Sequence, residues 1–189
     1  MILVVPYDPS WAVQFEELKA VFVRIPGQNF VTVEHVGSTS VPGLAAKPIL
    51  DIDLVVDGQE SFAQARTALE DLGYRFAGDL GIPDRYAFKA THHRIPDDGS
   101  GRSWPAHHLY CCIGGSMALR NHLLLRDALR RDSDLAAAYG NLKKDLAVKA
   151  NGDMDIYIEG KSAFIASVLE REGLSREDIT GIVEQNRKR

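Results

Sequence analysis

The sequence predicts an α+β fold, in which a mixed β-sheet core with flanking helices is followed by an α-helical C-terminal half. Segments of helical and strand character alternate as far as residue 115, and only helical patterns follow from Ser116 onward. The chain of 189 residues is long enough for one well-cored domain but short for two independent ones. We therefore expect residues 1–115 to form the core and residues 116–189 to form a helical subdomain packed on it, as a single globular unit.

The first segments set up the alternation of helix and strand. Apolar residues at helical spacing predict a first helix near the start: Trp11, Phe15, Leu18 and Phe22. β-Branched residues predict a strand over residues 30–36, and the mostly apolar residues 49–56 predict a second, buried strand. Between these strands, residues 40–48 contain two prolines and leave room only for a short helix. Residues 61–74 form a helical pattern that a glycine ends.

The middle and the end of the chain complete the predicted architecture. Aromatic and β-branched content predicts three further strands, in residues 74–78, 85–91 and 106–114. Turn-rich segments separate these strands, which favours a mixed sheet over a purely parallel one. Four helical patterns follow: residues 117–131, 133–150, 155–172 and 175–186.

Composition and charge narrow the classes of protein. Apolar residues make up 45% and charged residues 25% of the chain, which is ordinary usage for a globular protein. The formal charge of −4 argues against a broad binding surface for nucleic acid. No apolar run approaches the roughly 18 residues that a membrane span requires, and the start lacks the pattern of a secretory signal. We expect a cytoplasmic protein without membrane partners.

Two aspartates stand out in the second predicted strand. Asp51 and Asp53 are separated by one apolar residue, so the two-residue period of a strand places both carboxylates on one face. Two ionised carboxylates on an apolar strand are costly unless a cation, hydrogen bonds or exposure at the rim of the sheet relieves their repulsion. Mg²⁺ or Mn²⁺ suits such oxygen ligands and also binds substrate phosphates.

A turn rich in hydroxyl groups precedes these aspartates: Gly37, Ser38, Thr39 and Ser40. The glycine lets the backbone approach a ligand, and the hydroxyls and amides at the start of a helix can donate hydrogen bonds to an anion. Lys47 follows the turn, and it is either a phosphate contact or a surface lysine. Each feature alone has an ordinary explanation, as a capped turn or a solvated strand end. Together they favour one cleft for phosphoryl or nucleotidyl transfer.

Further side chains could join this cleft. His108 and Tyr110 share a face of the last predicted strand, and His108 could carry a proton or bind the metal if that strand neighbours Asp53. The alternative is a strand-end histidine bonded to backbone. Of Glu34 and His35, only one can share the face of the turn. The sequence lacks the motifs of dinucleotide, P-loop, esterase and thiol-protease sites, which leaves metal and phosphate chemistry.

The stretch "EHVGSTSVPGLAAKPILDID" resembles the signature of the GrpB family, a group similar to the nucleotidyltransferase superfamily. Shorter matches, "YDPSW" near the start and "YIEGKSAFI" near the end, extend the resemblance over nearly the whole chain. The resemblance implies a nucleotidyltransferase-like core. It also implies that Gly37 and Ser38 bind nucleotide phosphate and that Asp51 and Asp53 hold Mg²⁺.

The chain departs from the superfamily pattern at one point. Active members usually carry a third carboxylate on a following strand, whereas the last predicted strand has His108 and Tyr110 but no acid. A third carboxylate completes metal binding or activates the nucleophile. The leading hypothesis is a Mg²⁺-dependent nucleotidyltransferase that uses a nucleoside triphosphate and an unidentified acceptor. The alternatives are a non-catalytic module that binds nucleotide or phosphate, and a protein-docking role for the helical half.

Overall fold

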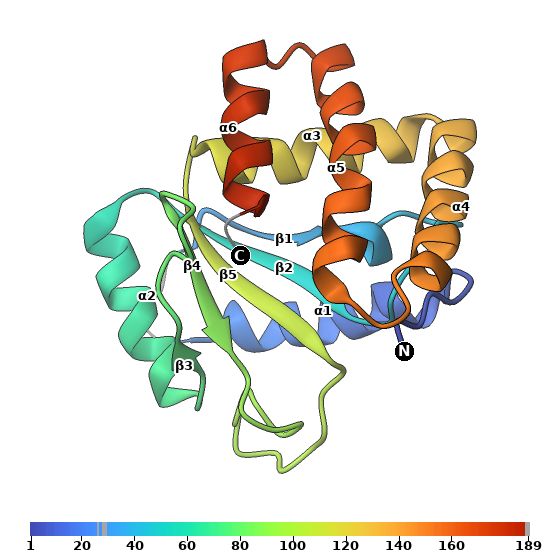
Figure 1. Ribbon diagram of the computed structural model, residues 1–189. Helices are drawn as coiled ribbons and strands as arrows, with labels where there is room; N and C mark the ends of the chain where they lie inside the picture. Colours follow the sequence, from blue (N-terminus) through green and yellow to red (C-terminus); the bar gives the residue numbers. More distant parts are fainter. Residues whose placement is uncertain (26, 28–29, 188–189) are drawn as a thin grey trace.

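The described residues contain one five-stranded sheet with the strand order β1-β2-β5-β4-β3 (Figure 1). The computed structural model describes residues 1–25, 27 and 30–187, with side chains as far as Ile182. The strands are β1 (Thr32–Val36), β2 (Leu50–Val56), β3 (Arg75–Phe76), β4 (Arg85–Lys89) and β5 (His107–Ile113). Neighbours β2 and β5 run parallel, and the other neighbouring pairs run antiparallel. The predicted mixed sheet is therefore confirmed.

Strand β2 lies inside the sheet and shows two chemically different faces. Its even-numbered residues are at most 1% exposed and belong to the main hydrophobic core: Leu50, Ile52, Leu54 and Val56. Burying each such side chain contributes about 1.5–3 kcal/mol to folding. The odd-numbered residues, which include Asp51 and Asp53, point to the other face of the sheet. Burial of the even-numbered side chains in the core fixes the orientation of β2, so the aspartate side chains lie on the opposite face of the sheet.

The apolar face of the sheet is covered by α1 (Ser10–Phe22) and α2 (Gln59–Asp71). The residues predicted to form the apolar stripe of α1 are all buried. These side chains and the buried side chains of α2 pack against the even-numbered side chains of β2 in one cluster. In Figure 1 these two helices lie on the opposite side of the sheet from the helical half of the chain.

The other face is covered by the helical half, beginning with α3, which contacts β1 and β5. This half comprises α3 (Met117–Arg131), α4 (Ser133–Lys149), α5 (Met154–Arg171) and α6 (Arg176–Arg187). Ser116 caps α3 by accepting a hydrogen bond from the amide of Leu119, and Asp132 caps α4. Among the described residues, no helix is long and apolar enough to cross a membrane.

The connection between β1 and β2 differs from its prediction. Residues 40–48 were expected to leave room for a short helix, but the only helical turn in this connection is the 3₁₀ turn η1 (Ser38–Ser40). A turn at residues 42–43 follows, and the backbone is then extended at Ala46, which exchanges both backbone hydrogen bonds with Val5, each of 2.9 Å. Pairing with the start of the chain therefore replaces the expected helix and holds the connection against the sheet.

Candidate functional site

Both aspartates of β2 lie on the face that α3 covers. In the parallel register Asp51 is beside His108 and Asp53 is beside Tyr110, so the condition for His108 to join the site is met. The side chain of Asp51 is 32% exposed, whereas that of Asp53 is fully buried. The two carboxylates therefore share a face, as predicted, but only Asp51 reaches solvent.

Asp53 is paired with a histidine from the helical half. The ring Nδ1 of His122, on α3, lies 2.7 Å from Oδ2 of Asp53. Burial alone lowers the pKa of His122, but the charge and hydrogen bond of Asp53 outweigh burial and raise it. The second oxygen, Oδ1 of Asp53, is buried without a hydrogen-bond partner in the described part of the chain. A buried carboxylate oxygen without a donor is costly, so it indicates a place for a cation or a ligand donor.

Asp51 forms a second carboxylate–imidazole pair. Nδ1 of His108 lies 2.9 Å from its Oδ1. The contact brings His108 to the floor of the site. Within the residues that the structure describes, no group of three or more histidines, cysteines or acids is close enough together to hold a metal ion by itself.

The glycine of the turn lies directly against Asp51. Gly37 adopts a φ of 66°, a left-handed conformation that favours glycine. A Cβ at this position would overlap with Oδ2 of Asp51. Both the backbone angle and the missing side chain are therefore required for the turn to approach the carboxylate. The two motifs that the sequence placed at neighbouring strand ends are in contact.

The three hydroxyl residues after Gly37 divide between two cavities. Ser38 lines the cleft above Asp51. Thr39 and Ser40, also predicted to bind phosphate, line a second cavity of about 430 Å³ behind the turn. Their hydroxyls already have partners, because Thr39 Oγ1 lies 3.1 Å from Nε2 of His35 and Ser40 Oγ donates to the carbonyl of Gly37 at 2.7 Å. Of these three residues, Ser38 is the one that lines the cleft.

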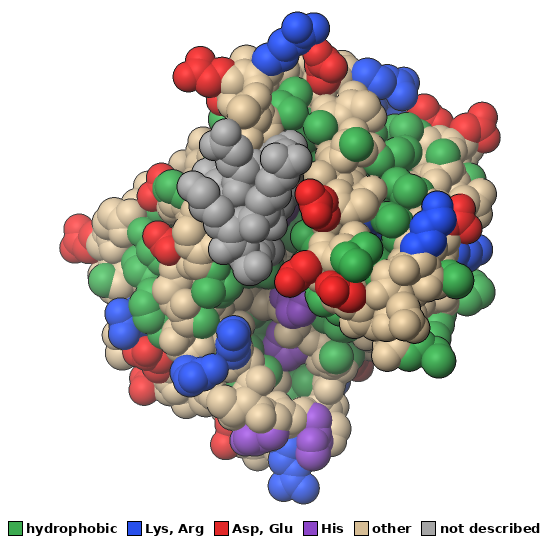
Figure 2. All heavy atoms as spheres, viewed as in Figure 1, with side chains coloured by type: hydrophobic (Ala, Val, Ile, Leu, Met, Phe, Trp, Pro, Cys, Tyr) green, Lys and Arg blue, Asp and Glu red, His purple; other side chains and the backbone are tan. Residues whose placement is uncertain are grey.

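The cleft has a volume of about 290 Å³ and lies between the sheet and the helical half. Figure 2 shows histidine side chains in the hollow below the helices, with acidic side chains close by. Asp51, His108 and Tyr110 form its floor, and Lys47 and Lys161 stand at its walls. Nζ of Lys47 and Nζ of Lys161 lie 5.7 Å and 4.6 Å from the ring centre of Tyr157. The predicted Lys47 therefore does border the cleft.

Two lysines of the helical half are held in unfavourable surroundings for a charge. Lys143, on α4, is 2% exposed, and its Nζ has no hydrogen-bond partner among the described residues. Burial and the neighbouring charge of Lys161 lower the pKa of Lys143 to about 7. Burial and the charge of Lys47 lower the pKa of Lys161 to about 8. An anion in the cleft would relieve this concentration of positive charge.

The structure settles which residue of β1 faces the cleft. Glu34 pairs across the strands with Asp53 and points towards α3, where Arg126 binds its carboxylate at 2.6 Å. His35 points the other way and stacks on Phe15 of α1 with ring centres 4.6 Å apart. Burial lowers the pKa of His35 to about 4, so this ring is neutral. Glu34 is therefore the acid on the cleft face of β1.

Sequence reasoning did not find the contribution of α3. His122 and Arg126 both line the cleft, and they are four residues apart on one helix face. The segment "LRNHLLLRDALRR" contains the signal, since its basic residues repeat at intervals of four. That period also fits a solvated helix face, so the sequence alone does not show where the face points.

Comparison with known proteins places the chain in a family. The family model described as GrpB protein matches residues 1–171. The chain belongs to the GrpB family. Its relatives include UPF0157 protein SCO7215 of Streptomyces coelicolor, 35% identical over 90% of this chain and 83% of that protein.

GrpB relatives differ in length. UPF0157 protein YqkA of Bacillus subtilis is 32% identical over 88% of this chain, which spans only 46% of YqkA. The crystal structure of the conserved protein GrpB from Enterococcus faecalis has a TM-score of 0.74 and 31% sequence identity, with 95% of this chain and 99% of that one covered. The fold described above is therefore that of a GrpB protein.

Proposed function

We propose that this GrpB protein is a Mg²⁺-dependent nucleotidyltransferase that moves a nucleotidyl group from a nucleoside triphosphate to an unidentified acceptor. The observation that carries the proposal is the contact between Gly37 and Asp51, because it brings the predicted phosphate-binding turn against the exposed member of the carboxylate pair, and both residues line the cleft. Mn²⁺ would serve in place of Mg²⁺ with the same oxygen donors.

The donor set fits a hard divalent cation. Asp51 is partly exposed at the floor of the cleft, and Asp53 keeps one buried oxygen without a donor among the described residues. These two carboxylates would hold the ion, and the triphosphate and water would complete its coordination. A bound Mg²⁺ would neutralise phosphate charge that develops during transfer.

The remaining residues of the chain would orient the substrate. The turn at Gly37 and Ser38 would place its amides and one hydroxyl against a phosphate. Lys47 and Lys161 would neutralise the outer phosphates from the walls of the cleft, and the charge of Lys143, which interacts with that of Lys161, would add to theirs. His108, held by Asp51, would accept or donate a proton at the acceptor or serve as an auxiliary ligand.

Titration calorimetry with Mg²⁺ and nucleoside triphosphates tests this proposal. The wild-type protein is expected to bind Mg-nucleotide, and the double variant Asp51→Asn/Asp53→Asn is expected to lose most of that affinity. Asp145→Asn is the matched control, since Asp145 is an exposed acid on α4. The proposal fails if the wild type binds no nucleotide, or if the double variant binds Mg-nucleotide as tightly as the wild type.

A second candidate is a non-catalytic module that binds a nucleotide or phosphate. The observation that favours it is β5, which presents His108 and Tyr110 to the cleft and contributes no acid. Incubation with nucleotides labelled at the α-phosphate and with cell extract separates the two functions. Transfer of label to any acceptor excludes a pure binder, whereas binding without transfer supports the module.

A further inference from the structure

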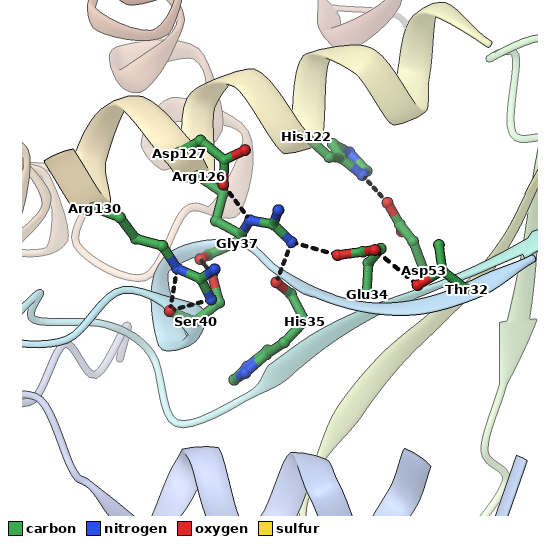
Figure 3. A network of polar contacts seen from close by, with 10 residues as sticks. All are labelled: Thr32, Glu34, His35, Gly37, Ser40, Asp53, His122, Arg126, Asp127 and Arg130. Carbon is green, nitrogen blue, oxygen red and sulfur yellow. Dashed lines mark hydrogen bonds and ion pairs between the residues drawn. The ribbon is translucent and has the colours of Figure 1, made fainter. Parts of the chain in front are cut away.

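Three side chains of helix α3 contact the strands and the turn that carry the candidate site. His122, Arg126 and Arg130 follow one another at intervals of four residues, so their side chains lie on one helix face. Figure 3 shows the three side chains pointing from α3 towards the strands and the turn. Their targets are Asp53 of β2, the end of β1 and the turn itself.

Arg126 holds the segment that enters the turn. Its Nη1 donates to Oε2 of Glu34 at 2.6 Å and to the carbonyl of His35 at 3.3 Å. Its Nε donates to Oδ1 of Asp127 at 2.7 Å, which fixes the guanidinium from the helix side. The side chain of Arg126 is only 12% exposed. Charge-assisted bonds in such a protected place are stronger than those at an open surface.

Arg130 holds the segment that leaves the turn. Its Nε and Nη2 both donate to the carbonyl of Ser40, at 3.0 Å and 2.8 Å (Figure 3). No carboxylate of the described residues forms an ion pair with Arg130, so its hydrogen bonds go to this one backbone oxygen. The backbone bonds of the turn are longer, since the amides of Ser40 and Val41 each lie 3.3 Å from their acceptors. Inside the turn the one short bond is the 2.7 Å bond from Ser40 Oγ to the carbonyl of Gly37, so the carbonyl of Ser40 is held to α3 through Arg130.

We propose that Arg126 and Arg130 are positioning residues that clamp both ends of the Gly37–Ser40 turn to α3 and so set its approach to Asp51. This inference rests on the proposed function of the cleft, and it extends that function to the helical half. Gly37 already touches Asp51, so a small displacement of the turn changes the space available to a phosphate. Release of either arginine would let the turn move while the strands stay in place.

A purely local role for Arg130 is the competing explanation. Basic residues in the last turn of a helix interact favourably with its dipole, and α3 ends with both Arg130 and Arg131. The two arginines have different partners, however. Nη2 of Arg131 binds Glu172 at 2.6 Å, and the Arg131 side chain is 60% exposed. Arg131 therefore shares the helix-end effect but does not touch the turn, which makes it a matched control.

The test compares Arg130→Gln, Arg130→Lys and Arg131→Gln in the full chain. Amide hydrogen exchange over residues 37–41 reports the turn directly, and calorimetry with Mg²⁺ and a nonhydrolysable ATP analogue reports binding. We expect Arg130→Gln to speed exchange about tenfold and to weaken binding about tenfold, since a charged hydrogen bond is lost. Arg130→Lys should recover part of both effects, and Arg131→Gln should change neither.

The outcomes separate the clamp from the proposed function. Unchanged exchange and unchanged affinity in Arg130→Gln would overturn the clamp. If the wild type binds no nucleotide, the proposed function fails, while the exchange comparison still decides whether α3 holds the turn. Should Arg130→Gln not fold, Arg130→Lys carries the test, and equal exchange in Arg130→Lys and Arg131→Gln would then contradict the clamp.

Discussion

Lys143 carries a charge in surroundings that do not support it. Its pKa falls from 10.5 to about 7, and its Nζ lacks a hydrogen-bond partner in the described part of the chain. Between about pH 7 and pH 10.5, Lys143 binds a proton in the unfolded chain but not in the folded chain. The free energy of unfolding therefore rises with pH across this range. Below about pH 7 the folded protein bears the full cost of the buried ammonium.

Replacing Lys143 with methionine should therefore stabilise the protein. We expect Lys143→Met to raise the free energy of unfolding at pH 7 by about 1–3 kcal/mol, because an apolar side chain of similar length removes a buried ammonium whose neighbour is the ring of Tyr139, 4.7 Å away, and not a hydrogen-bond acceptor of the described residues. Urea unfolding at pH 7 and pH 9 measures the change, and the gain should shrink at the higher pH. Lys144→Met, at an exposed neighbour, is the control. A loss of stability in Lys143→Met would show that the contact of the ammonium with the Tyr139 ring outweighs the cost of its burial.

Alanine substitutions at Gly37 and Gly43 can separate two costs in folding free energy: the cost of a left-handed backbone and the cost of overlap with Asp51. Both have positive φ, 66° and 80°, but only a Cβ at Gly37 would meet another atom. We expect Gly43→Ala to cost about 1 kcal/mol, the price of a left-handed alanine. Gly37→Ala should cost about 2–4 kcal/mol, since the overlap with Asp51 adds to the strain. Thermal unfolding measures both, and equal costs would contradict the close approach.

Individual helices and strands could be predicted where periodicity is strong. The predicted helix over residues 117–131 coincides with α3, and the predicted strand over residues 49–56 differs from β2 by one residue. The connection after β1 was harder to predict, because its extended course depends on pairing with Val5 near the start of the chain. Local propensity does not contain such a distant partner.

The candidate site was predictable in part for the same reason. Asp51, Asp53 and Gly37 lie within one short segment, so the shared face of the two aspartates and the nearness of Gly37 followed from strand geometry. His122 is 69 residues from Asp53 in the sequence, and the packing of α3 on the sheet brings them together. The hydroxyls of Thr39 and Ser40 turned away from the cleft because His35 and the turn's own carbonyl engage them. Neither arrangement has a signal in local sequence.

The molecule as a whole depends on contacts between its two halves. The pairs His122–Asp53 and Arg126–Glu34 join α3 to the sheet, and α3 also packs against α4 and α5. The assignment of residues 1–115 and 116–189 as parts of one unit stays a prediction.

Two spectroscopic probes can test whether these halves unfold together. Trp11 and Trp104, the two tryptophans of the chain, are buried in the core of the first half, whereas most of the helix lies in the second. We expect tryptophan fluorescence and far-UV circular dichroism to give the same urea midpoint, because the halves share buried charge pairs. Separated midpoints would show that the helical half unfolds independently of the core.

Side chains of β2 alternate between the core and the cleft face, so both depend on the register of this strand against β1 and β5. Its even-numbered residues fill the core under α1 and α2, and its odd-numbered residues carry the carboxylates under α3. A slip of one residue against β1 and β5 would turn Asp51 and Asp53 into the leucine-rich layer and expose that layer to the cleft. Such a chain would lose its core and its carboxylate–histidine pairs in the same step, so the register of β2 preserves both at once.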